Sequence, residues 1–146
     1  MNVDSDVLRP LRAYFTCLQF GDFAGLNDVF TADAIGNWGP QGEVHLVGIE
    51  AITVHLSTVA ALTSVTFAPS PAMIDANGER ARARLRVVAH LTDDETLTLA
   101  CAEYSDELQA SPDGWRISRR DHHELWRAAM PLTALHPSLA RTGTNG

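Results

Sequence analysis

Residues 80–91 switch between apolar and mostly charged side chains at every second position. The apolar positions are Ala81, Ala83, Leu85, Val87, Ala89 and Leu91, and the positions between them are Arg80, Arg82, Arg84, Arg86, Val88 and His90. Because successive side chains of a strand point to opposite faces of a sheet, this period of two predicts a long strand with one buried and one mostly cationic face. We expect His90 to point away from the core.

Turn signals divide the rest of the C-terminal half into further strands. Asn77-Gly78 is the dipeptide most typical of a two-residue hairpin, and it follows short runs of period two around 65–67 and 73–74. Asp93-Asp94 leads into a long strand at about 95–108, and the turn at 111–114 leads into a final strand. The pattern therefore predicts a meander of long antiparallel strands.

The N-terminal half has helical spacing instead. A helix at about 6–20 would place on one face Val7, Leu8, Leu11, Tyr14, Phe15 and Leu18. Gly21 ends it, and Asp22 can cap a second short helix in which Phe23, Leu26 and Phe30 repeat at helical spacing. A short strand at 34–38 and a turn at 39–42 precede a third helix, which begins after Gly48 and has His55 beside its apolar stripe.

Three helices followed by a meander predict an α+β fold in which a curved antiparallel sheet wraps the helices. The 146 residues, 45% of them hydrophobic, suit a single domain with one core. We place that domain at 1–130 and expect a loosely ordered tail at 131–146. Such a sheet encloses a pocket on its concave face.

Charge and composition exclude several classes of partner. Eighteen acidic residues against eleven basic ones give a formal net charge of −7, which argues against nucleic acid and anionic membrane as partners. The chain shows no secretion signal and no membrane span, and Cys17 and Cys101 are interpreted as two buried thiols, so we expect a cytoplasmic protein. No metal-ligand spacing and no glycine-rich phosphate loop occur, so we predict no metal and no cofactor.

The final strand is the first candidate for chemistry, because it begins with alternating apolar residues and then carries Arg, Asp and His before Trp126. Under strict alternation, Asp121 and His123 share a face with Ile117. A bulge near Arg120 would reverse the alternation and turn Arg120, His122 and Glu124 inward instead. The sequence does not decide whether His122 or His123 faces the pocket.

Several segments resemble the SnoaL-like branch of the nuclear-transport-factor-2-like superfamily, which also holds the ketosteroid isomerases. They are Tyr14–Phe23, Val29–Ala34, Gly48–Ile52 and Asp113–Arg120, and the resemblance covers about residues 6–127. It implies a cone-shaped α+β barrel with three N-terminal helices and an enclosed pocket. Relatives include isomerases, dehydratases, polyketide cyclases, epoxide hydrolases and non-catalytic binders, so the resemblance does not fix one activity.

The resemblance also implies roles for individual residues. Tyr14 matches the tyrosine that donates to the substrate oxyanion in ketosteroid isomerases. The catalytic aspartate of those isomerases falls here on Trp38 or, with a slip of one residue, on Asn37, and neither takes up a proton at neutral pH. Their second oxyanion-binding acid aligns near Tyr104, with Glu103 as its neighbour.

We therefore predict a cofactor-independent enzyme that cyclises, isomerises or dehydrates a small hydrophobic substrate, polyketide-like or polycyclic, by general acid-base catalysis. The predicted catalytic residues are Tyr14, His55, Asp121 and His123, where an imidazole with a pKa of about 6.5 beside a carboxylate serves as the base. The predicted substrate-binding residues are Trp38, Asn37, Tyr104, Glu103, Arg120 and His122. Alternatives are a non-catalytic binding protein and an epoxide hydrolase-like enzyme using an Arg/Asp pair. We expect a homodimer through the convex sheet face.

Overall fold

The computed structural model describes residues 2–61 and 63–134, which form two α-helices, two 3₁₀ helices and seven strands. In chain order the elements are α1 (Val3–Phe20), η1 (Ala24–Asp28), β1 (Phe30–Trp38), β2 (Val44–Val47), α2 (Ile49–Ala60), β3 (Ser64–Pro69), β4 (Met73–Asn77), β5 (Arg80–Thr92), β6 (Thr96–Ser111), β7 (Gly114–Pro131) and η2 (Leu132–Ala134). The α+β fold is as predicted.

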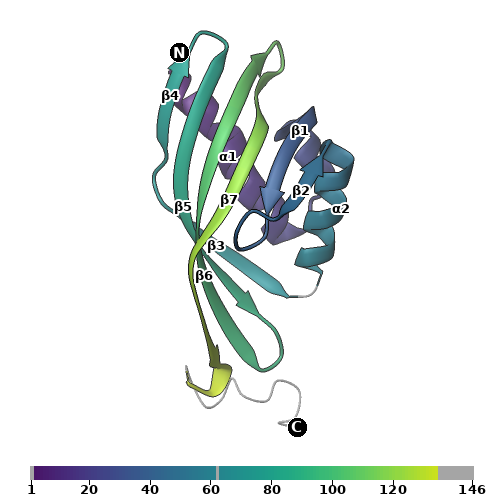
Figure 1. Ribbon diagram of the computed structural model, residues 1–146, viewed down its shortest axis with the longest axis vertical. Coiled ribbons are helices and arrows are strands. Elements are labelled where there is room, and N and C mark those ends of the chain that lie inside the picture. The colour runs from purple at the N-terminus through teal and green to yellow at the C-terminus, as the bar shows by residue number, and fades with distance from the viewer. Residues whose placement is uncertain (1, 62, 135–146) are drawn as a thin grey trace.

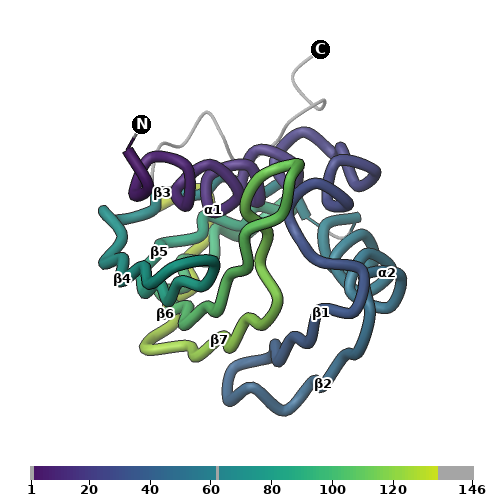
Figure 2. Tube along the Cα trace, turned by 90° about the horizontal axis from the view of Figure 1, so that it is seen from above, coloured from purple at the N-terminus to yellow at the C-terminus, as the bar shows by residue number. Residues whose placement is uncertain are grey.

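The seven strands form one sheet in the order β2-β1-β7-β6-β5-β3, and β4 pairs with a separate stretch of β5. The sheet curves around α1, which crosses its concave face, while α2 lies beside β1 and β2 (Figures 1 and 2). The predicted barrel is left open, because β2 and β3 end the order without meeting. The sheet also departs from the predicted antiparallel pattern in one place, since β1 and β7 are parallel.

Helix α1 has a defined beginning and end. The side chain of Asn2 accepts a hydrogen bond from the backbone N–H of Asp4 at 3.0 Å, and Gly21 ends the helix in the left-handed conformation at φ 71°. Between these caps the predicted apolar face is buried against the sheet, with Tyr14 1% exposed. This placement puts the Tyr14 side chain under the middle of the sheet.

The segment after Gly21 differs from the prediction. Residues 24–28 form a 3₁₀ helix, and Phe30 begins β1 instead of ending a second α-helix. The parallel pairing of β1 with β7 brings Phe30 opposite Ile117, and both side chains are buried, so tertiary packing overrides the helical spacing. The short strand β2 was not predicted; its Val44–Val47 side chains are half-buried or exposed and give a weak pattern.

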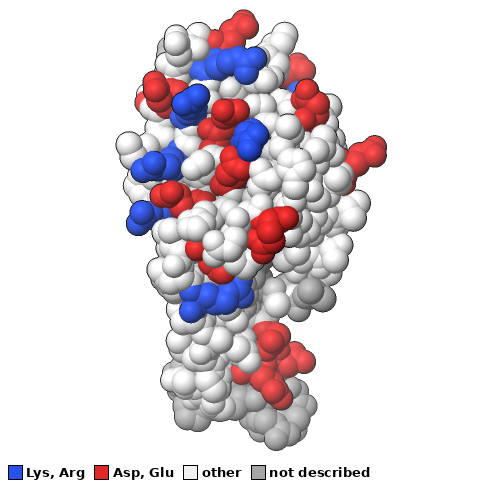
Figure 3. All heavy atoms as spheres, viewed as in Figure 1, with Lys and Arg blue, Asp and Glu red and all other residues white. Residues whose placement is uncertain are grey.

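The predicted faces of β5 are confirmed. Ala81, Ala83, Leu85 and Val87 are buried, whereas the arginines lie on the outer face. On that face Glu103 of β6 lies 3.7 Å from Arg84 and 3.3 Å from Arg86. Charged side chains of both signs alternate over the upper half of this face (Figure 3). The arginine row is therefore partly neutralised by its neighbours.

Strand β7 continues to Pro131 and is followed by η2, so the ordered structure passes the predicted domain end at 130. The remainder of the predicted tail, 135–146, lies outside the described residues. Cys17 and Cys101 are both buried free thiols. In the described parts of the chain, no helix is long and apolar enough to cross a membrane.

Candidate functional site

A cavity of about 270 Å³ lies between the helices and the concave face of the sheet. Most of its lining is aliphatic or aromatic, including Leu18, Leu56, Val65, Phe67, Val87, Ala89 and Ala102. Its polar lining comes from six side chains, those of Tyr14, Trp38, His55, Thr63, Tyr104 and His122, together with the Glu124 and Arg127 pair. An apolar cavity with a few convergent polar groups is the usual form of a small-molecule site.

A β-bulge in β7 decides which charged residues face this cavity. Leu108 pairs with Ile117 and Glu107 with Arg119, so Ser118 is an extra residue without a partner position on β6. The extra residue reverses the alternation, and His122 faces the cavity. The expected inward placement of Asp121 and His123 under strict alternation is therefore wrong, and the bulge alternative is confirmed.

A second register shift restores the original alternation. Ala102 pairs with Glu124 but Cys101 pairs with Trp126, so Leu125 is the second extra residue. Beyond it Arg127 lines the cavity, and its Nε donates to Glu124 Oε1 at 2.8 Å. Only the stretch between the two bulges is reversed relative to the rest of β7.

His122 is fixed in one orientation by the loop after β1. Its Nδ1 lies 2.9 Å from the carbonyl oxygen of Gly39. A carbonyl oxygen only accepts hydrogen bonds, so Nδ1 carries the hydrogen, and in the neutral ring Nε2 holds the free lone pair. Burial lowers the pKa of His122, against the opposing effect of the Gly39 hydrogen bond. The neutral ring is thus favoured at neutral pH, with Nε2 as its basic atom.

Trp38 and Tyr14 form a buried hydrogen-bonded pair. The indole Nε1 of Trp38 donates to the Tyr14 hydroxyl oxygen at 3.3 Å. An indole has no acceptor, so Tyr14 accepts this bond and its own hydroxyl hydrogen is free to donate elsewhere. Gly36 permits the arrangement, since a Cβ at that position would lie 1.9 Å from the Trp38 ring. Trp38 therefore orients the Tyr14 hydroxyl in the cavity wall.

Arg120 lies beneath the two tyrosines and is completely buried with its partner, Asp106. Its Nε donates to Asp106 Oδ1 at 2.8 Å and its Nη2 to Oδ2 at 2.7 Å. The guanidinium carbon lies 4.3 Å from the ring centroid of Tyr14 and 4.2 Å from that of Tyr104. Burial lowers the pKa of Arg120, but the charge and hydrogen bonds of Asp106 raise it above its ordinary value overall. A fixed positive charge is thus held between two phenol rings.

Both phenols remain protonated at neutral pH. Burial raises the pKa of Tyr14, and the Arg120 charge and the Trp38 hydrogen bond offset this only in part. Burial raises the pKa of Tyr104 further still, again against the charge of Arg120. Protonated phenols donate hydrogen bonds, so this wall of the cavity suits an oxygen atom that accepts them.

His55 contributes a second imidazole to the same cavity. It projects from α2, and its ring centroid lies 6.2 Å from that of Trp38. His122 comes from β7, where its ring lies 5.3 Å from the Tyr104 ring. The cavity therefore has imidazoles supplied by two different elements, with the phenol groups of Tyr14 and Tyr104 also in its lining.

The remaining predicted residues lie outside the cavity. Glu103 pairs with outer-face arginines, and His123 is exposed. Asn37 donates to Asp121 Oδ1 at 2.7 Å, and its own Oδ1 lies 2.6 Å from His45 Nδ1. Asp121 also accepts a hydrogen bond from Arg119 at 3.0 Å. These residues form a polar network across β2, β1 and β7, apart from the cavity lining.

Asp106 was missed from the sequence, although a signal for it existed. The inward positions of β6 are Ala100, Ala102, Tyr104, Asp106 and Leu108, so one carboxylate interrupts an otherwise apolar series. A carboxylate at a core position requires a partner. The buried partner is Arg120, which the sequence suggested as a residue turned inward by a bulge and as a substrate-binding residue, but not as the partner of Asp106.

Comparison with known proteins agrees with this architecture. Residues 2–121 match the model of the SnoaL-like domain. No functionally curated protein matches the chain by sequence. Three solved structures illustrate the structural similarity, and because their identities to the chain are low, they establish the fold alone.

A candidate scytalone dehydratase from Novosphingobium aromaticivorans is 18% identical, with a TM-score of 0.77 over 85% of each chain. A candidate dehydratase of the NTF2-like family from Streptomyces avermitilis is 16% identical, with a TM-score of 0.72 over 86% of this chain and 99% of that one. An NTF2-like protein with a cystatin-like fold, also from N. aromaticivorans, is 21% identical, with a TM-score of 0.74 over 94% and 89%.

Proposed function

This chain belongs to the family of SnoaL-like domains, which includes dehydratase-like and isomerase-like members, and we propose that it is an enzyme that removes a proton from a carbon next to a carbonyl group. The main support is the tautomer of His122, whose Nδ1–H is held by Gly39 so that Nε2 is the basic atom of a cavity residue. The same cavity presents protonated phenols as hydrogen-bond donors.

In the proposed first step the substrate carbonyl accepts hydrogen bonds from Tyr14 and Tyr104. His122 Nε2 takes a proton from the adjacent carbon, and the electron pair of the broken C–H bond forms a carbon–carbon double bond as negative charge moves to the oxygen. The two phenols and the Arg120 charge behind them stabilise this oxyanion. These interactions strengthen as charge develops, which is the requirement for lowering the barrier.

The second step determines the product. In an isomerisation or cyclisation, the His122 imidazolium returns its proton to the rearranged carbon skeleton. In a dehydration, the enolate expels a hydroxyl group from the next carbon, His55 supplies the proton that makes it water, and the proton that His122 took up then replaces the one lost by His55, so that both imidazoles return to their starting states. The second imidazole in the lining is suited to that role.

The substrate is a small, largely apolar compound with one carbonyl group. The cavity volume of about 270 Å³ lies just below the range of roughly 300–1,000 Å³ usual for ligand pockets. An epoxide hydrolase-like reaction is less well supported, because Arg120 is held by both oxygens of Asp106 and both side chains are fully buried. Neither residue belongs to the cavity lining.

The proposal is tested with a compact ketone that need not be the natural substrate. Proton removal next to the carbonyl of 2-tetralone in deuterium oxide exchanges that proton for deuterium, which proton NMR follows. We expect the protein to accelerate exchange, and His122→Gln to lose about 10²- to 10⁴-fold of the acceleration. His123→Gln is the matched control, since that imidazole is exposed, and it should retain the full rate.

A non-catalytic binding protein is the second candidate, because an indole stands where the resemblance places the catalytic aspartate of the isomerases. Saturable binding of 2-tetralone without any exchange above the buffer rate would favour it. Loss of exchange in His123→Gln with a normal rate in His122→Gln would refute the assignment of the base.

A further inference from the structure

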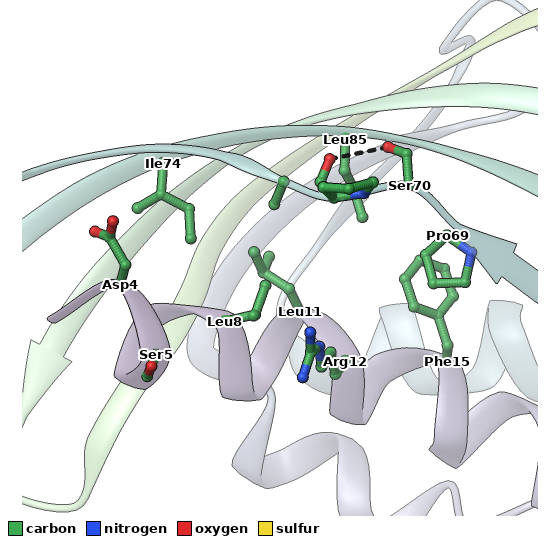
Figure 4. Close-up of a pocket in the computed structure, with 12 residues that line it drawn as sticks. Asp4, Ser5, Leu8, Leu11, Arg12, Phe15, Pro69, Ser70, Ile74 and Leu85 are labelled. Atoms are coloured by element: carbon green, nitrogen blue, oxygen red, sulfur yellow. Dashed lines mark hydrogen bonds between the residues drawn. The ribbon is translucent and has the colours of Figure 1, made fainter. Parts of the chain in front are cut away.

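A second cavity of about 460 Å³ lies under the same helix, beyond the end of the first. Its apolar lining comes from α1, β3, β4 and β5, and includes Leu8, Leu11, Phe15, Pro69, Ile74 and Leu85. Figure 4 shows these side chains facing one another across the gap between α1 and the strands, with Phe15 and Pro69 together at one end.

The two cavities occupy consecutive stretches of the same concave surface. On β3, Phe67 lines the first cavity and Pro69 the second; on β5, Val87 lines the first and Leu85 the second. Each pair is two residues apart on one strand, so the members point to the same face. The boundary between the two cavities therefore crosses β3 between Phe67 and Pro69, and β5 between Leu85 and Val87.

Phe15 supplies the partition at this boundary. It lines the second cavity and is absent from the lining of the first. Its ring centroid lies 5.0 Å from that of Phe67, 5.9 Å from that of Tyr104 and 5.3 Å from that of Tyr14, all of which line the first cavity. Phe15 thus lies between Tyr14 and Tyr104 and the second cavity.

We infer that Phe15 limits the length of the ligand, an inference that rests on the proposed binding of a carbonyl group by Tyr14 and Tyr104. A carbonyl held there has its ring system in the first cavity, and its other substituent points toward the Phe15 ring. The Phe15 ring therefore leaves little room for that substituent. The substrate class is an aryl or cyclic ketone whose second carbonyl substituent is no larger than a short alkyl group.

Two fluorescent ketones test the inference by titration. Both carry a naphthalene ring on the carbonyl; 2-acetylnaphthalene has a methyl group on the other side and 2-octanoylnaphthalene has a seven-carbon chain. We expect the wild-type protein to bind the acetyl compound and to bind the octanoyl compound at least tenfold more weakly, or about 1.4 kcal/mol. Phe15→Ala should remove that preference by joining the cavities.

Leu8→Ala is the matched control, because Leu8 lines the second cavity but makes none of the ring contacts with the first. It should keep the wild-type preference. Phe15→Leu shortens the same side chain while keeping an apolar group, so it should weaken the preference even if Phe15→Ala does not fold. Circular dichroism establishes that each variant is folded.

The binding measurements distinguish a failure of the length limit at Phe15 from a failure of the proposed carbonyl site. If the acetyl compound binds and the octanoyl compound binds the wild-type protein equally well, or neither Phe15 variant alters the preference, Phe15 is not the limit while the carbonyl site stands. If neither ketone binds the wild-type protein or either folded variant, the carbonyl site and the length limit are both refuted.

Discussion

Replacing Asp106 should destabilise this protein more than almost any other single change, because it would leave the Arg120 guanidinium buried without its counter-ion. Both side chains have no solvent exposure, and their two hydrogen bonds measure 2.8 and 2.7 Å. Breaking one partner of a buried ion pair costs about 3–5 kcal/mol. A domain of this kind has only about 5–15 kcal/mol of unfolding free energy, so Asp106→Leu should lose a large part of it.

The two single variants should respond differently to pH. Arginine stays protonated up to very high pH, so Asp106→Leu should lose the same free energy throughout the neutral range. In Arg120→Met the buried carboxyl can accept a proton instead. Burial already raises the pKa of Asp106, and Arg120 is the group that lowers it, so its removal raises the pKa further.

The protonation states of Asp106 determine whether Arg120→Met gains or loses stability as pH rises. Below its unfolded-state pKa of about 3.9, the Asp106 carboxyl is neutral in both states of Arg120→Met, so charge burial costs nothing. As pH rises, the unfolded chain loses its proton first, and the variant loses stability by about 1.4 kcal/mol per unit until the raised folded-state pKa is reached. Arg120→Met should therefore be more stable at about pH 5 than at about pH 8 relative to Asp106→Leu.

Urea unfolding, followed by tryptophan fluorescence at both pH values, measures these differences. The double variant Arg120→Met/Asp106→Leu has no buried charge and should recover most of the loss, giving a coupling free energy of about 3 kcal/mol between the sites. Asp106→Asn is the conservative control, which keeps an acceptor oxygen without the charge. Additive effects of the two single changes, or equal pH profiles, would refute the description of a buried, mutually dependent pair.

Three further predictions concern the site and the outer face. The exchange rate with 2-tetralone should stay constant down to about pH 6.5 and fall only below it, because burial lowers the pKa of His122 and the neutral ring is the base; a midpoint above that value would contradict the assignment. Tyr14→Phe should lower the exchange rate by about 10²- to 10³-fold with a smaller change in ketone affinity measured by calorimetry, since a donor to the oxyanion is removed; an unchanged rate would exclude Tyr14 from the reaction. Trp126 is 48% exposed and pairs with Cys101 on the outer face, so if the expected homodimer forms there, Trp126→Glu should weaken it by about 2 kcal/mol or more in sedimentation equilibrium; a wild-type monomer at micromolar concentration would remove the expectation.

The fold was predictable because its signals are local and repeated. The apolar series from Ala81 to Leu91, the Asn77-Gly78 turn and the helical stripe around Tyr14 each depend on neighbours in sequence, and the structure confirms all three. Phe30 shows the limit of such reasoning. Its spacing from Phe23 and Leu26 is helical, but a parallel strand 87 positions later in the chain, at Ile117, fixes its conformation.

The site was predictable in its components but not in its orientation. Tyr14, Trp38, His55 and Tyr104 occupy the cavity wall as expected. The choice between His122 and His123 depended on one unpaired residue, Ser118, whose hydroxyl donates to the Glu107 carbonyl oxygen at 3.1 Å. Nothing in the local sequence predicts a bulge at Ser118, because the register of β7 is set by its pairing with both β6 and β1.

The two bulges in β7 confine the reversed alternation to one short stretch of the strand. Residues 119–124 are shifted by one position relative to the strand on either side, and the shift ends at Leu125, so the strand beyond it returns to the original alternation. Two alternating sets of polar side chains therefore coexist in one strand: Arg120, His122 and Glu124 point inward, and Arg119, Asp121 and His123 point outward. Moving the first bulge from Ser118 to the C-terminal end of this stretch would exchange the two sets, so the position of one bulge determines which set faces the cavity.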